Sequence, residues 1–347
     1  MRVLLTGHQG YLGTVMSTVL LEKGHDVVGL DSGLFASCVL GPYPVDPPTL
    51  ALDLRDVQRE HLLGFEAVIH LAALSNDPLG SLDPQLTYDI NHRAAVRLAR
   101  LAKDAGTRRF LYASTCSVYG AAGEDLVNEE APLRPVTPYA RSKVLVEEDL
   151  DRLADAGFSP VYLRNATAFG FSPRLRADIV LNNLVGSAVL TGEVTVLSDG
   201  TPWRPLVHVL DIAEAFCAAL TAETQAVHNR PFNIGAEANN LTVAEIAQHV
   251  VDAVPGSTLR ITGATGSDPR SYRVDFSAIR NALPGYQARR GVGEGAAELV
   301  ANYRAHGLTE HDFAGRFVRL AALNDQLASG ALGADLRRLA APLAVEP

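Results

Sequence analysis

The chain is poor in cysteine, in long apolar runs and in positive charge. Its only three cysteines, Cys38, Cys116 and Cys217, are widely spaced, which fits neither a disulfide framework nor a structural zinc site and favours a reducing cytoplasm. The 30 Lys and Arg residues face 39 Asp and Glu residues, and a net charge of −9 argues against sequence-independent binding to nucleic acid. We expect no leader peptide and no membrane contact, because no apolar run approaches the roughly 18 residues of a membrane span.

Over its first half, the sequence alternates short Val/Leu/Ile runs with longer segments of helical period. This alternation is typical of a parallel sheet that helices cover on both faces, so we predict a doubly wound (Rossmann) α/β fold. Strands are predicted at residues 2–6, 26–30, 49–52, 67–72, 109–113 and 160–164. Helices are predicted at residues 11–23, 88–105 and 142–156, the last one closed by Gly157 in a left-handed conformation.

The regular alternation fades after residue 164, where we expect a smaller α+β lobe. Its predicted elements are a helix at 179–190, a strand at 194–197 and a helix at 242–254, while 203–220 reads as a strand and an amphipathic helix that return to the first lobe. The predicted division is a first domain of residues 1–164 with a returning segment of about 203–235, a second lobe of residues 165–202 and 236–308, and a helical tail of residues 309–347.

Three glycines, Gly7, Gly10 and Gly13, lie between the first predicted strand and the first predicted helix. One interpretation is that these glycines merely form a tight turn. However, a second predicted strand ends in Asp31, 18 residues past Gly13. This context favours a dinucleotide whose diphosphate lies at the helix N-terminus. A carboxylate at Asp31 can accept hydrogen bonds from both ribose hydroxyls of adenosine. No Arg or Lys lies between Asp31 and Asp53 to bind a 2′-phosphate, so we predict NAD in preference to NADP.

Tyr139 and Lys143 are four residues apart and would share one face of a helix. A free tyrosine has a pKa of about 10, and a close ammonium lowers that pKa and makes the phenol a usable base. The same spacing also occurs in an exposed Tyr and a solvated Lys, but the dinucleotide signature favours the catalytic interpretation, since a hydride acceptor needs a base beside it. Hydroxyls for the reacting oxygen follow the strand at 109–113, as Ser114, Thr115 and Ser117.

At this point the sequence resembles the extended short-chain dehydrogenase/reductase family, the group of nucleotide-sugar epimerases and dehydratases. The resemblance covers about residues 1–280 and rests on TGHQGYLG, GHDVVGLD, HLAAL, STCSVYG, PYARSK and RPLVHVLD, which stand in the family's order. The opening motifs look most like those of UDP-galactose 4-epimerases. By this resemblance, Thr115 matches the catalytic Ser/Thr, Tyr139 the base, and Lys143 the residue that lowers the pKa of Tyr139 and holds the nicotinamide ribose. The implied cofactor contacts are Gly7, Gly10, Tyr11, Leu12, Gly13, Asp31, Asp53, Leu54, Leu71, Ala72, Ala73, Tyr139 and Lys143.

The resemblance also implies a site for a nucleotide-diphosphate sugar. The implied substrate contacts are Ser75, Thr115, Cys116, Asn182, Arg204 and Arg270, the two arginines as cations for the phosphates. A surface salt bridge is the alternative for either arginine. The chain departs from the family at Thr167, where an Asn is common, and Asn165 stands two places earlier.

These observations predict an NAD-dependent nucleotide-sugar epimerase that acts at C4 through a 4-keto intermediate. In 4,6-dehydratases an Asp and a Glu follow the catalytic Ser/Thr, whereas Cys116 and Ser117 stand here, which argues against dehydration. The alternatives are a ketoreductase of a nucleotide keto-sugar, with the same residues, and a non-catalytic NAD-binding sensor. Cys116 is either a packing residue or a proton donor at a neighbouring carbon. The resemblance implies a homodimer through helices 88–105 and 142–156, and no metal is predicted.

Overall fold

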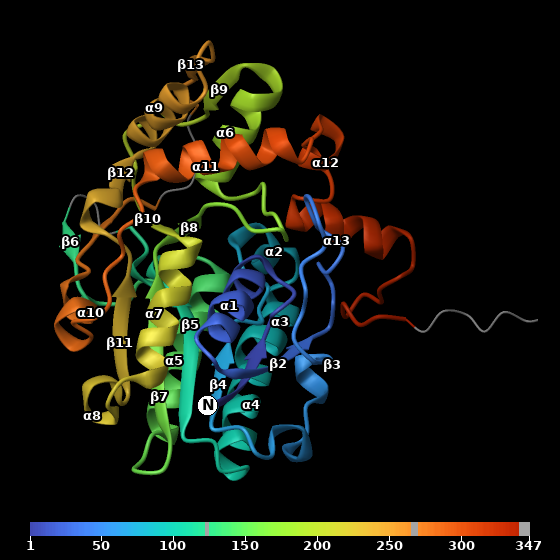
Figure 1. Ribbon diagram of the computed structural model, residues 1–347, viewed down its shortest axis with the longest axis vertical. Helices are drawn as coiled ribbons and strands as arrows, with labels where there is room; N and C mark the ends of the chain where they lie inside the picture. Colours follow the sequence, from blue (N-terminus) through green and yellow to red (C-terminus); the bar gives the residue numbers. More distant parts are fainter. Residues whose placement is uncertain (122–124, 265–269, 340–347) are drawn as a thin grey trace, which may run out of the picture.

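The computed structural model describes residues 1–121, 125–264 and 270–339. Its centre is a parallel sheet in the order β11-β7-β5-β4-β1-β2-β3 (Figure 1). The strands of this sheet are β1 (Arg2–Thr6), β2 (Asp26–Asp31), β3 (Thr49–Ala51), β4 (Ala67–His70), β5 (Arg109–Thr115), β7 (Ser159–Asn165) and β11 (Arg230–Ile234). The order reverses at β1, which pairs with both β2 and β4, and this confirms the predicted doubly wound fold.

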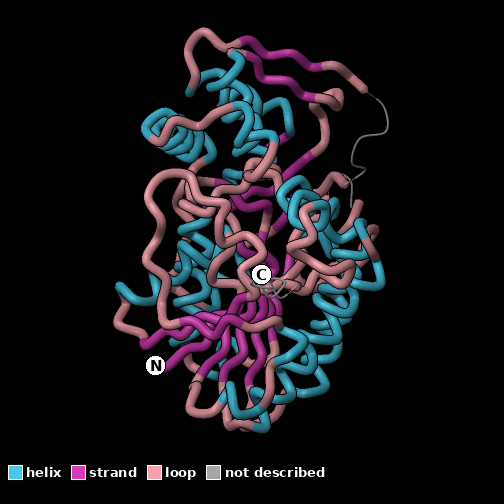
Figure 2. Tube along the Cα trace, turned by 90° about the vertical axis from the view of Figure 1, so that its right-hand side faces the viewer, coloured by secondary structure: helices cyan, strands magenta, loops and turns pink. Residues whose placement is uncertain are grey.

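Apolar side chains on both faces of the sheet explain why its strands read as nearly continuous hydrophobic runs. In β1, Val3 and Leu5 join one core with α1 (Tyr11–Glu22) and α7 (Val209–Thr221). Leu4 points to the opposite face, into a second core with α4 (Ala94–Asp104) and α5 (Pro138–Leu153). Strands and helices thus form a three-layer arrangement, with the sheet between the two helical layers (Figure 2).

Two predicted helices differ from the observed ones in instructive ways. Helix α5 begins at Pro138, four residues earlier than predicted, because the Thr137 side chain caps it by accepting from the Ala140 N–H at 3.1 Å. It ends at Leu153, and the prediction that Gly157 closes it in a left-handed conformation is wrong: the Gly157 N–H donates to Asp155 in a turn beyond the helix. The helix predicted at 88–105 is a π-helix, η3 (Tyr88–Arg93), followed by α4.

The second lobe lies above the sheet in Figure 1 and encloses its own apolar core, to which α6, α9 and α11 contribute. Its helices and strands are β8 (Thr167–Phe169), α6 (Val180–Thr191), β9 (Glu193–Val196), β10 (Trp203–His208), β12 (Asn240–Thr242), α9 (Val243–Ala253), β13 (Thr258–Ile261) and α11 (Val292–Ala305). The strands β9 and β13 pair with each other. A further pair, β6 (Leu126–Val127) and β14 (Arg273–Val274), packs its valines into the core of the first lobe. The predicted segment 203–220 is divided: β10 pairs with β8 and β12, whereas α7 packs on α1. The exact domain boundaries stay a prediction.

The remaining elements are short helices. They are η1 (Leu54–Asp56), η2 (Arg59–Leu62), α2 (Asp77–Leu82), α3 (Pro84–Thr87), η4 (Cys116–Tyr119), α8 (Thr224–Val227), η5 (Glu237–Asn239), α10 (Ser277–Ala282), α12 (Glu310–Ala314) and α13 (Arg319–Ala328). One of them, η4, is largely buried. The predicted tail contains α12 and α13, and its residues 340–347 lie outside the described residues. Among the described residues, none of the helices has the length and apolar character that crossing a membrane requires.

The turn between β1 and α1 generates a test of the fold. A Cβ added at Gly13 would lie 2.1 Å from the Gly7 carbonyl oxygen, whereas one at Gly285 would meet no atom within 4 Å. We expect Gly13→Ala to lower the free energy of unfolding by about 1–3 kcal/mol, because α1 must move away from the turn. Urea denaturation measures the loss, and Gly285→Ala is the matched control. Equal stability of the two variants would contradict this packing.

Candidate active site

The carboxyl ends of the central strands open into a cavity of about 600 Å³. Residues directly after β1, β2, β4, β5 and β7 line it, as expected for a ligand at the switch point of a doubly wound sheet. Loops of the second lobe and two side chains of the C-terminal tail complete the wall. Within the three described stretches, no group of His, Cys, Asp and Glu residues is arranged to hold a metal ion.

The glycine turn leaves its backbone open to this cavity. Gly7 adopts a φ of +76°, and a Cβ there would lie 2.7 Å from the Ala72 nitrogen, so only glycine fits the turn. Gly10 is the N-cap of α1 and has no side chain to cover the first N–H groups of the helix, and Tyr11, Leu12 and Gly13 follow it in the wall. Free N–H groups at a helix N-terminus suit a diphosphate, and these residues therefore fit a dinucleotide.

The predicted adenosine contacts lie at the other end of this region. Asp31 accepts from the Gln9 N–H at 3.0 Å and from the Gly33 N–H at 2.8 Å, which orients its carboxylate. Asp53 forms two hydrogen bonds with the Arg55 side chain, at 2.6 and 2.8 Å. Burial raises the pKa of Asp53, but the hydrogen bonds and charge of Arg55 outweigh burial and hold that pKa below its usual range. The other predicted cofactor residues in the wall are Leu54, Leu71, Ala72 and Ala73.

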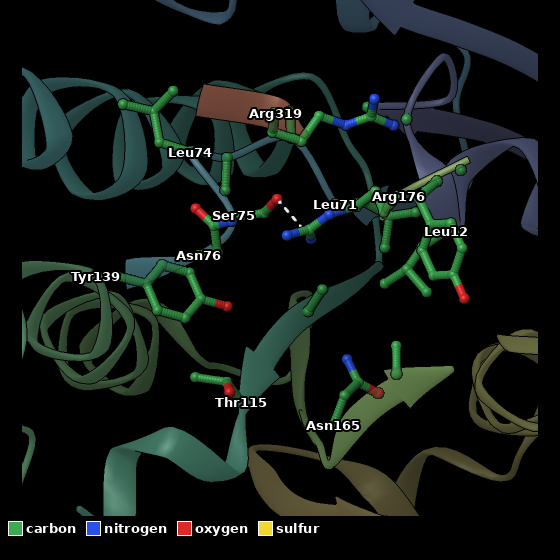
Figure 3. Close-up of a pocket in the computed structure, with 18 of the residues that line it drawn as sticks. Leu12, Leu71, Leu74, Ser75, Asn76, Thr115, Tyr139, Asn165, Arg176 and Arg319 are labelled. Carbon is green, nitrogen blue, oxygen red and sulfur yellow. Dashed lines mark hydrogen bonds between the residues drawn. The ribbon is translucent and has the colours of Figure 1, made fainter. Parts of the chain in front are cut away.

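The predicted catalytic residues meet in the cavity beside this region (Figure 3). Thr115 is the last residue of β5, and Tyr139 lies in the first turn of α5 with its phenol directed into the cavity. Lys143 is one turn further along α5; its Nζ donates to the Ala113 carbonyl oxygen at 2.7 Å and lies 5.7 Å from the centre of the Tyr139 ring. The early start of α5 at Thr137 and Pro138 thus places both residues on one helix face.

The electrostatics of this group differ from the simple expectation for a Tyr–Lys pair. Burial raises the pKa of Tyr139 to about 12; Asp77 raises it as well, while Arg176, Thr115 and Arg270 lower it. Burial lowers the pKa of Lys143 to about 7, against the opposing effect of Glu147. Lys143 is therefore only partly charged at neutral pH, and in this structure Arg176 and Arg270 are the cations that act on the phenol.

Two predicted substrate residues do not reach the cavity. Cys116 is fully buried below it; its thiol donates to the Arg164 carbonyl oxygen, and burial raises its pKa far above the usual range. Asn182 is fully buried between the Gly170 backbone, the Arg176 carbonyl oxygen and the Tyr11 hydroxyl. The structure supports no substrate contact by either side chain.

Neighbouring residues take these places in the wall of the cavity. Ser117 follows Cys116, and Asn183 follows Asn182 on α6, rotated by about 100° around the helix axis. A difference of one residue on a helix or turn therefore decides which of two adjacent side chains faces a ligand.

The other three predicted substrate residues line the cavity. Ser75 accepts a hydrogen bond from Arg176 at 3.3 Å (Figure 3). Arg270 pairs with Asp77 at 2.5 Å, and its carbonyl oxygen accepts a hydrogen bond from Arg204. The two arginines therefore lie next to each other in the wall of the cavity.

Several cavity residues were missed in the sequence. Asn165 ends β7 beside Thr115, and its side-chain oxygen is buried without a partner; its position after a predicted strand could have identified it. Arg176 comes from the loop between β8 and α6, and one of its terminal nitrogens is also buried without a partner. Arg319 and Leu336 come from the tail, where no motif marks them.

The low pKa of Lys143 generates a test by pH. Because this pKa falls from 10.5 to about 7 on folding, the unfolded chain binds more protons between these values and stability rises with pH there. We expect Lys143→Met, which removes the titration, to stabilise the protein most at and below pH 7, with the gain shrinking toward pH 10. Urea denaturation at several pH values measures the gain in the free energy of unfolding. The control is Lys23→Met at an exposed position. A gain that is constant from pH 6 to 10 would contradict the burial of a titrating amine.

Comparison with known proteins places this site in a family. The NAD dependent epimerase/dehydratase family model matches residues 3–235. The UDP-glucose 4-epimerase of Mycolicibacterium smegmatis is 30% identical over 317 residues, which cover 88% of this chain and 99% of that enzyme. UDP-glucuronic acid decarboxylase 1 of Arabidopsis thaliana is 27% identical over 323 residues, covering 90% of this chain and 72% of that one.

Solved structures agree with this placement. The complex of MoeE5 with UDP-glucose and NAD superimposes with a TM-score of 0.74 at 28% sequence identity, covering 88% of this chain and 99% of that one. NAD is the cofactor of the family, and the glycine turn and Asp31 described above fit it. The chain belongs to the NAD-dependent epimerase/dehydratase family of nucleotide-sugar enzymes.

Proposed function

We propose that the chain is an NAD-dependent nucleotide-sugar epimerase that inverts C4 through a transient 4-keto sugar. The observation that carries this proposal is the meeting of Thr115, Tyr139 and Lys143 in one cavity with the glycine turn at its edge. Relatives named UDP-glucose 4-epimerase, at about 30% identity, support the same reaction. The location in the cytoplasm and the homodimer stay predictions.

Each of the three residues has a separate task. Tyr139 accepts the proton of the C4 hydroxyl and later returns it to the C4 oxygen of the inverted sugar. Thr115, whose hydroxyl also acts on the phenol, donates a hydrogen bond to the reacting oxygen. Lys143, held by the Ala113 carbonyl oxygen and only partly charged at neutral pH, keeps an exchangeable proton beside the phenol. Bound NAD supplies the hydride acceptor at C4 and, in its oxidised form, a further positive charge.

The residues around Thr115 support epimerisation over dehydration. The two positions after it carry no carboxylate: Cys116 is buried outside the cavity and Ser117 lines it. The carboxylate of Asp77 does line the cavity, but it pairs with Arg270 at 2.5 Å and accepts from the Thr137 hydroxyl at 2.6 Å. Both oxygens of this carboxylate are therefore engaged by Arg270 and the Thr137 hydroxyl.

Two arginines of the second lobe would hold the substrate. Arg204 and Arg270 line the cavity, with Arg270 beside Asp77 and Ser117, and arginine is the side chain best suited to phosphate oxygens. The nucleotide would then lie against the second lobe, with the sugar directed to Tyr139.

Substrate labelled with deuterium at C4 tests the reaction. The purified protein, given C4-deuterated UDP-glucose without added reductant, should form the C4 epimer with deuterium retained at C4. Tyr139→Phe should lower kcat at least about 100-fold while NAD stays bound, because the proton acceptor is lost. Proton NMR of the products measures both outcomes, and exposed Tyr43→Phe is the matched control.

Other outcomes of this experiment separate the alternatives. If the protein leaves this substrate unchanged but consumes NADH when it is given a 4-keto nucleotide sugar, a ketoreductase would replace the epimerase. Loss of deuterium to solvent would contradict hydride transfer at C4. Full activity of Tyr139→Phe would remove the phenol from the reaction.

The charge of Arg176 generates a second test. This guanidinium lowers the pKa of Tyr139, so Arg176→Met should raise that pKa and move the acid limb of kcat/KM to higher pH. At pH values below the pKa of Tyr139, each rise of about one unit in that pKa lowers the fraction of Tyr139 present as phenolate about tenfold. Arg176→Lys keeps the charge and is the control. A pH profile of Arg176→Met that equals the wild-type profile would contradict an electrostatic effect on the phenol.

A further inference from the structure

The C-terminal segment 319–339 lies against the loop that follows β2. The Arg338 side chain donates to the Ser32 carbonyl oxygen at 2.9 Å and also to that of Gly33. Gln326 donates to the Leu34 carbonyl oxygen at 2.8 Å. All three acceptors come directly after Asp31, the residue placed at the adenosine ribose, so the segment is attached next to the dinucleotide end of the cavity.

Further contacts attach the segment to the wall of the cavity itself. Arg55, which also pairs with Asp53, donates to the Asp335 carbonyl oxygen at 2.9 Å. Leu336 is buried and lines the cavity although its φ is +61°, a left-handed conformation that is costly for leucine. The apolar cluster that holds the segment comprises Leu74, Leu79, Leu86, Leu323, Leu332 and Leu336.

Arg319, the first residue of α13, enters the cavity from this segment (Figure 3). Its side chain is only 2% exposed, lies 4.8 Å above the Phe35 ring and donates to the Arg174 carbonyl oxygen at 3.2 Å. One terminal nitrogen, Nη1, is buried without a hydrogen-bond partner.

Among the described residues, no carboxylate forms a salt bridge with Arg319. Asp178, whose charge acts on Arg319, already pairs with Arg176 at 2.9 Å. Burial, together with the like charge of Arg176, lowers the pKa of Arg319 to about 10. A buried cation with an unpaired N–H group is costly unless an anion meets it, and the ligand of this cavity carries phosphates.

We propose that segment 319–339 is the outer wall of the dinucleotide site and that Arg319 donates hydrogen bonds to the diphosphate of the dinucleotide. The segment lies beyond residues 3–235, the part of the chain that matches the family. The diphosphate of the nucleotide sugar is the other source of this anion. Contacts with Leu34 and Phe35 favour the dinucleotide, whereas Arg204 and Arg270 serve the sugar nucleotide from the second lobe. The proposal rests on NAD binding and not on the C4 reaction.

Exchange of bound NAD in the full-length holoenzyme tests this assignment. Radiolabelled NAD is added in excess, and its incorporation is followed after rapid gel filtration. Arg319→Met should exchange NAD about 10- to 100-fold faster than the wild type, because a charge-assisted contact to phosphate is lost. Its urea midpoint should stay equal or rise, since Met fills the space and removes a buried charge. A merely structural arginine would instead lower that midpoint and leave the exchange rate unchanged.

A second pair of variants tests the wall. Arg338→Ala removes the contacts with the Ser32 and Gly33 carbonyl oxygens and should also accelerate NAD exchange, by several-fold. Arg304→Ala is the matched control, because Arg304 is exposed on α11 and does not line the cavity. Equal exchange rates in Arg338→Ala and Arg304→Ala would contradict a wall that retains the cofactor.

Binding of UDP to the holoenzyme, measured by calorimetry, separates the two diphosphates. An unchanged dissociation constant for UDP in Arg319→Met, with faster NAD exchange, supports the proposal. Weaker UDP binding with unchanged NAD exchange would assign Arg319 to the sugar nucleotide and overturn the proposal. Unchanged values for both ligands would overturn it as well. Absence of epimerase activity in a chain that still retains NAD would contradict only the proposed C4 reaction.

Discussion

The close contact between the first turn of α1 and the loop after β1 is the constraint on which the cavity depends. With hydrogen atoms alone at Gly7 and Gly13, the helix N-terminus approaches both its own turn and the backbone after β4. The same contact leaves the first N–H groups of α1 directed at the carboxyl edge of the sheet, where the other strands also end. A diphosphate-binding surface and the place of the reacting residues therefore follow from one packing arrangement.

Burial, more than any single ion pair, sets the chemistry of the reacting residues. It pushes the pKa of Tyr139 up to about 12 and that of Lys143 down to about 7, so that at neutral pH the phenol is neutral and the amine is only partly charged. Charge for the reaction must come from elsewhere in the cavity. In a chain with a net charge of −9, five arginines line this one cavity, namely Arg55, Arg176, Arg204, Arg270 and Arg319. Their concentration there gives an acidic protein a local site for anions.

Some residues that are adjacent in the chain differ in whether their side chains face the cavity, and the local backbone geometry explains the difference. Thr115 and Ser117 face the cavity, whereas Cys116 between them points into the core; Asn183 faces it, whereas Asn182 is buried behind it. Motif matching finds the correct segment, but a single position along a helix or turn rotates the side chain to another face. The proximity of Tyr139 and Lys143 was easier to predict, because a spacing of four residues on one helix is enough to bring them together.

The sequence by itself determined the doubly wound sheet, the glycine turn, the carboxylate of Asp31 after the second strand and the common helix face of Tyr139 and Lys143, because each depends on local periodicity or short spacing. The prediction of Thr115 came from the family resemblance. Only the tertiary structure decided which of two neighbouring residues faces the ligand. It also brought Arg176, Arg319 and Leu336 to the cavity and placed Arg338 beside the loop after Asp31, which has no Arg or Lys of its own up to Asp53. Such contacts join parts of the chain up to about 300 residues apart, and no local pattern records them, since they arise only when the tail packs across the folded sheet.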